Sequence, residues 1–159
     1  MSQLVRLYLI ASAALCALGV IVHLAAIPLG AEWAAFIGAP RGLLPMLERG
    51  SVRPALTCIL ISSVLAIWSM YGLSAAGLLA RLPALRLVLA LSGGTLILRA
   101  FVLPVVAVWE PDALSDICGR CQQFNGFVLF TSLLCLFIGG GYALAALQLR
   151  PNLRSGGEI

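Results

Sequence analysis

Four long stretches of this chain contain almost no charged side chain. They are residues 7–31, 54–80, 87–109 and 121–149, and Arg99 is the only charged residue within them. Each stretch is longer than the roughly 20 apolar residues that an α-helix needs to cross a bilayer. Only helices and closed barrels satisfy every backbone polar group inside lipid, so the pattern predicts an all-α integral membrane protein.

Composition supports this class and excludes a soluble domain. Charged residues make up only 10% of the chain, against about a quarter in soluble domains. The net charge of +4 carries no basic patch interleaved with aromatic residues, so no nucleic-acid partner is predicted. We expect a single membrane domain over residues 1–159, a four-helix bundle with helices at about 5–29, 54–80, 84–109 and 121–149 and an outer loop at 30–53. The short 81–86 turn makes the second and third helices antiparallel neighbours.

The distribution of arginine predicts how the chain is oriented. The N-terminus, the 81–86 turn and the C-terminal tail hold five arginines (Arg6, Arg81, Arg86, Arg150 and Arg154), whereas the other two loops hold four, together with acidic residues. Because basic residues favour the cytoplasmic side, both termini are expected to be cytoplasmic. The predicted location is a bacterial-type inner (plasma) membrane, crossed several times.

Small residues gather in the half of each helix nearer the predicted inner surface. They include residues 11–14, 72–77, 92–95 and 139–141. Small side chains let membrane helices approach closely, so the helices are expected to be tight on the inner side and wider on the outer side. A polar cavity open to the outer face is therefore predicted, with Asn125 and Gln122 among its ligand-binding residues.

Arg99 and His23 are the other predicted ligand-binding residues, both in the outer half of the bundle. A charge within a membrane helix is costly and marks a functional hypothesis, although a long side chain can also extend to the headgroups. His23 is the only histidine, so it cannot form a bis-imidazole haem site, but it can donate to a quinone oxygen or a carboxylate. Glu48 is a candidate counter-charge for Arg99 if its loop folds inwards.

Cys118 and Cys121 form a C-x-x-C motif at the predicted outer start of the last helix. A helix N-terminus stabilises a thiolate, and Arg120 between the two cysteines adds positive charge. An extracytoplasmic location favours a disulfide. One histidine and scattered cysteines do not supply a four-ligand set, so no metal site is predicted. The pair is thus a catalytic candidate or a structural disulfide.

Four helices with Cys118-Gly-Arg-Cys121 before the last one resemble the vitamin K epoxide reductase family, and the design is similar to that of the bacterial disulfide-bond formation protein B. The resemblance implies that the pair faces a bound quinone, which reoxidises it, and exchanges electrons with a second cysteine pair in an outer loop. This sequence departs from that pattern, since residues 30–53 contain no cysteine and Cys16, Cys58 and Cys135 lie within predicted helices.

Three function classes follow from these features. The first, and the function that we expect from the sequence, is a quinone-linked thiol–disulfide oxidoreductase, in which Cys118 and Cys121 exchange electrons while Arg99 and His23 orient the quinone. The second is a non-enzymatic protein that binds a lipid or small ligand, or supports a larger complex, and has a structural disulfide. The third is a small transporter, which would need to form a homo-oligomer. Membrane lipids and a quinone or other lipophilic ligand are the expected partners.

Overall fold

The computed structural model describes residues 2–114, 118–121 and 123–149, and these contain helices and no strand. The elements are α1 (Gln3–Phe36), η1 (Arg41–Leu43), α2 (Leu44–Glu48), α3 (Val52–Ala75), α4 (Leu85–Trp109), η2 (Pro111–Leu114) and α5 (Gly126–Gln148). Helices α1, α3, α4 and α5 are long and apolar enough to cross a membrane. The predicted all-α class and the four apolar spans are confirmed.

The helix ends differ from the predicted bounds at three places. Helix α1 continues to Phe36, but Gly30 breaks it with a φ of 79° shortly after Pro28. Proline removes a helical hydrogen-bond donor, and glycine adopts positive φ without steric cost, so the chain changes direction here. The Trp33 indole N–H donates to the Val22 carbonyl (3.1 Å), which fixes the redirected segment. Helix α3 ends at Ala75, and α5 begins at Gly126 rather than near residue 121.

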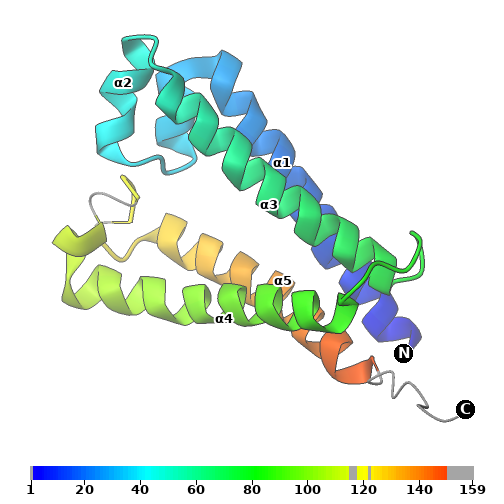
Figure 1. Ribbon diagram of the computed structural model, residues 1–159. Helices are drawn as coiled ribbons and strands as arrows, with labels where there is room; N and C mark the ends of the chain where they lie inside the picture. The colour runs from blue at the N-terminus through cyan, green and yellow to red at the C-terminus, as the bar shows by residue number, and fades with distance from the viewer. Residues whose placement is uncertain (1, 115–117, 122, 150–159) are drawn as a thin grey trace, which may run out of the picture.

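The four long helices form two antiparallel hairpins, α1 with α3 and α4 with α5 (Figure 1). The hairpins meet where α1 begins and α5 ends, which we call the terminal end. They diverge towards α2 and the loop before α5, which we call the loop end. Hydroxyl groups reinforce the first hairpin, since Ser62 and Ser69 of α3 donate to carbonyls of α1 (Val20, 3.5 Å; Ala13, 2.9 Å).

Glycine contacts join the helices near the terminal end. A Cβ added to Gly93 of α4 would lie 2.9 Å from the backbone nitrogen of Ala143 and 3.0 Å from the carbonyl oxygen of Gly139, both in α5. A Cβ added to Gly72 of α3 would lie 2.9 Å from the side chain of Ala13 and 3.0 Å from that of Tyr142. Gly93 and Gly139, two of the small residues noted in the sequence, therefore lie where the backbones of α4 and α5 approach closely.

The buried core is divided into two clusters. The larger one lies at the terminal end and contains Leu9, Cys16, Leu89, Leu96 and Tyr142, with other residues of all four long helices. The smaller one lies at the loop end and contains Leu103, Ala107, Leu114, Cys118, Cys121 and Val128. The smaller cluster consists only of residues from α4 to α5, so it lies within the second hairpin.

The adjacent glycines of α4 provide a matched test of the helix crossing. Gly93→Ala should lower the free energy of unfolding by about 1–3 kcal/mol, because the new methyl group meets the backbone of α5. Gly94→Ala has nothing within 4 Å and should be neutral or stabilising, since alanine has the higher helix propensity. Thermal unfolding of the two variants in detergent measures the difference, and equal melting temperatures would contradict the crossing.

Candidate functional site

Cys118 and Cys121 form a disulfide in the loop that precedes α5, as the motif allowed. Both cysteines are buried, with exposed fractions of 8% and 0%. They pack against Leu103, Ala107 and Val128 in the loop-end cluster. Because α5 begins only at Gly126, the pair does not stand at the helix N-terminus, where the sequence placed it.

Asn125 caps α5 and ties it to the disulfide loop, which we define as residues 118–121. Its Oδ1 accepts hydrogen bonds from the backbone N–H groups of Phe127 and Val128, each at 3.0 Å. Its Nδ2 donates to the carbonyl oxygen of Arg120 at 2.9 Å. This predicted ligand-binding side chain is therefore engaged in capping the helix and holding the loop.

The disulfide loop docks on residues 36–39, a turn that follows α1 and that we call the cap turn. The Gly119 N–H donates to the carbonyl oxygens of Gly38 (3.3 Å) and Ala39 (3.2 Å). A Cβ on Gly119 would lie 2.6 Å from the Ala39 carbonyl oxygen, so only glycine permits this approach. The backbone bonds link the two hairpins at the loop end.

Arg120 completes the docking through its side chain. Its Nη1 donates to the carbonyl oxygen of Phe36 at 2.8 Å. The guanidinium also lies 5.6 Å from the ring centre of Phe36 and 4.9 Å from that of Phe127, within cation–π range. One charged residue thus contacts an aromatic ring of each hairpin.

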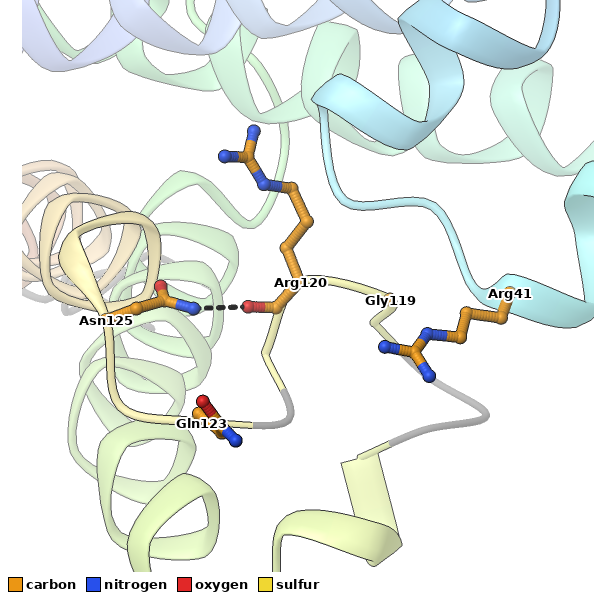
Figure 2. Close-up of a pocket in the computed structure, with 5 residues that line it drawn as sticks. All are labelled: Arg41, Gly119, Arg120, Gln123 and Asn125. Atoms are coloured by element: carbon orange, nitrogen blue, oxygen red, sulfur yellow. Dashed lines mark hydrogen bonds between the residues drawn. The ribbon is translucent and has the colours of Figure 1, made fainter.

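A shallow polar pocket of about 280 Å³ lies beside this contact, lined by Arg41, Gly119, Arg120, Gln123 and Asn125 (Figure 2). The Arg120 guanidinium points away from Gln123, whereas that of Arg41 points towards Gly119. A second pocket, of about 290 Å³, lies beside the Gly30 break and is lined by residues of α1, α2 and α3 with the Gly50–Ser51 connection.

The four predicted ligand-binding residues that the structure describes lie on separate elements. Arg99 is exposed on α4, and His23 is half-buried on α1, where its Nδ1 hydrogen-bonds the Gly19 carbonyl (2.8 Å). Glu48 is exposed at the end of α2, and Asn125 lies beside the disulfide loop. Gln122 lies outside the described residues.

The remaining cysteines do not form a second pair. Cys16, Cys58 and Cys135 are free thiols within α1, α3 and α5, and Cys16 accepts a hydrogen bond from the Tyr142 hydroxyl at 3.4 Å. Among the residues that the structure describes, no three His, Cys, Asp or Glu side chains are grouped to hold a metal ion.

Sequence reasoning missed the docking residues. The Cys118–Cys121 motif drew attention to its sulfur atoms, whereas the intervening Gly119 and Arg120 make the contacts with the cap turn. The one hint in the sequence was a glycine in each of the two segments that meet, Gly119 in the disulfide loop and Gly38 in the cap turn. Gly38 adopts a φ of 92° and packs against the Phe127 ring. Two loop glycines that permit close contact are recognisable as a pair only once the segments are known to meet.

No protein-family model, curated protein or solved structure matches the chain. The likeness to the vitamin K epoxide reductase family therefore stays a prediction from topology and one motif.

Substitution of Gly119 tests the docking of the disulfide loop. Gly119→Ala should push the loop away from the Ala39 carbonyl and raise the amide hydrogen exchange of residues 36–39 on the order of tenfold. Gly42→Ala is the matched control, because a Cβ there meets nothing within 4 Å. Exchange measured by mass spectrometry separates the variants, and unchanged protection in Gly119→Ala would show that the contact does not hold the two hairpins together.

Proposed function

We propose that this chain is a non-enzymatic accessory or lipophilic-ligand-binding protein of the inner membrane, with Cys118–Cys121 as a structural disulfide. The observation that carries the structural role of the disulfide is its burial beneath the cap turn. Cys121 is fully buried, and Cys118 is 8% exposed. Thiol–disulfide exchange needs access of an attacking thiolate to a sulfur atom, and such access is blocked here.

The surroundings of the pair support a structural role. Gly119 and Arg120, the two residues between the cysteines, are hydrogen-bonded to the carbonyls of the cap turn. Opening the disulfide would loosen the segment that carries these bonds. The bond therefore stabilises the only link between the hairpins at the loop end that involves backbone hydrogen bonds in the described part of the chain.

The oxidoreductase alternative lacks the second outer cysteine pair of that design, which carries electrons between the first pair and the substrate. The three free cysteines lie within α1, α3 and α5 and form no disulfide, and the described segments between these helices contain no cysteine other than Cys118 and Cys121. The quinone-linked mechanism is thus the less supported of the two functions.

The reduction potential of Cys118–Cys121 tests the structural role. In the purified full-length protein the midpoint should lie below about −300 mV, as is typical of structural disulfides. Cys121→Ser should trap no mixed disulfide in cells. Replacing both cysteines with serine should lower the free energy of unfolding by about 2 kcal/mol, as expected for a short closed loop.

Cys58→Ser is the control for this measurement, since it removes a free thiol from α3 and should leave the midpoint unchanged. A midpoint between about −270 and −120 mV, the range of thiol–disulfide oxidoreductases, would refute the structural role. So would a covalent adduct on Cys118 in the Cys121→Ser variant.

The orientation of the chain follows from its arginine distribution and has its own test. We expect the loop end outside and the terminal end in the cytoplasm. A membrane-impermeant maleimide should label Asp112→Cys on intact bacterial cells, and should label Arg81→Cys only after the membrane is permeabilised. Both positions are exposed in the structure. Labelling with the reverse pattern would invert the orientation.

A further inference from the structure

The polar pocket beside the disulfide loop has positive charge in its lining and no carboxylate. Its lining consists of one glycine, two arginines and two amides: Gly119, Arg41, Arg120, Gln123 and Asn125. The Arg41 guanidinium points towards Gly119 (Figure 2). Arg41 is exposed at the start of η1, so its N–H groups are accessible from outside the protein. The pocket therefore offers a cation and hydrogen-bond donors to an anionic group.

Arg120 adds charge to the pocket although its guanidinium turns away from it. The Nη1 of Arg120 donates to the Phe36 carbonyl, and the guanidinium points away from Gln123 (Figure 2). A neutral carbonyl and aromatic rings carry no full negative charge, so the positive potential of Arg120 extends to the pocket beside it. Arg41 is the residue whose guanidinium is placed to contact an anion there.

The walls of the pocket are fixed by contacts within the protein. The disulfide closes the loop that carries Gly119 and Arg120, and the Asn125 amide donates to the Arg120 carbonyl at 2.9 Å. The Gly119 N–H is bonded to the carbonyls of the cap turn, two residues before Arg41. A Cβ on Gly119 would lie 3.4 Å from Cγ of Arg41, so the stem of Arg41 passes close to the loop. A site with fixed walls binds its ligand at a lower cost in entropy.

The pocket lies at the end of the second hairpin that reaches the lipid headgroups. Helix α4 has 25 residues, which is roughly 37 Å at 1.5 Å per residue and exceeds the hydrocarbon core of about 30 Å. Asn125 directly precedes α5, at the end of the hairpin where α4 finishes with Trp109 (Figure 1). Trp109 is 81% exposed, and Phe124, between the two pocket amides, is 53% exposed. Exposed aromatic residues are typical of the membrane–water interface.

We infer that this pocket binds the phosphate group of an anionic phospholipid from the leaflet at the loop end. The inference rests on the proposed function and names its ligand. The Arg41 guanidinium donates to two phosphate oxygens, a geometry that its planar fork favours. The Gln123 amide supplies a further donor for the headgroup, while the acyl chains stay in the bilayer.

The size and charge of the pocket select the class of lipid. Its volume of about 280 Å³ is below the roughly 300–1,000 Å³ of pockets for drug-sized ligands, so it suits a headgroup rather than acyl chains. A lining without a carboxylate has no partner for the ammonium group of phosphatidylcholine. A lipid with a net negative charge, such as phosphatidylglycerol, is therefore favoured.

Free phosphate presents the same oxygen atoms but is the weaker ligand. A lipid phosphate is anchored by its acyl chains at the membrane surface, where the pocket lies, and this raises its effective concentration there. Free phosphate has no such anchor. A comparison of phosphatidylglycerol with inorganic phosphate therefore identifies the source of the bound group.

The binding test uses the purified full-length protein in an uncharged detergent and a phosphatidylglycerol with a fluorescent group on one acyl chain. The probe should bind saturably. Arg41→Gln should weaken binding on the order of tenfold, since charge-assisted hydrogen bonds are lost. Arg49→Gln is the matched control, because it removes the same charge from an exposed residue just after α2, outside the pocket lining, and it should retain the wild-type affinity.

Displacement of the probe from the native protein adds a readout that no folding defect can affect. Dioctanoyl phosphatidylglycerol should displace it, and dioctanoyl phosphatidylcholine and inorganic phosphate should each need a concentration roughly tenfold higher or more. Wild-type affinity in Arg41→Gln, an equal loss in Arg49→Gln, or equal displacement by either of these two competitors would overturn the proposal. Such a failure leaves a low redox midpoint of Cys118–Cys121 intact, whereas a labile disulfide would refute the structural role whatever lipid binds.

Discussion

The contact between Gly93 and Gly139 determines how the rest of the molecule can be arranged. It brings α4 against α5 at backbone distance, and the neighbouring Tyr142 then reaches α1 and α3 through Cys16 and the Trp68 carbonyl. In lipid there is no hydrophobic gain from pressing two apolar helices together, so close packing of small residues must hold them. These residues are concentrated at the terminal end, and helices that cross there at an angle separate further on.

Hairpins that diverge need a second attachment, and the disulfide loop supplies it. The Cys118–Cys121 disulfide closes a short loop whose two middle residues are Gly119 and Arg120. Gly119 brings its backbone to the cap turn, and Arg120 is held between Phe36 and Phe127. The disulfide that closes the loop packs within the loop-end cluster. The same motif that serves electron transfer elsewhere is used here, in our proposal, for its conformational rigidity.

The sequence predicts the spans well because the bilayer imposes length and polarity on every residue within it. It also located the small residues at the helix contacts and paired Cys118 with Cys121. Its failures lie at the loop end, where contacts depend on which segments meet in space. The sequence did not predict the break of α1 at Gly30 or the start of α5 at Gly126, where Asn125 caps the helix.

The central claim is that the Cys118–Cys121 disulfide keeps the two hairpins attached at the loop end. Double electron–electron resonance tests it directly, through the distance between spin labels on Val52→Cys of α3 and Val108→Cys of α4, two exposed positions. The account predicts one narrow distance distribution, which broadens when Cys118 and Cys121 are both replaced by serine. An unchanged distribution in that variant would contradict the account.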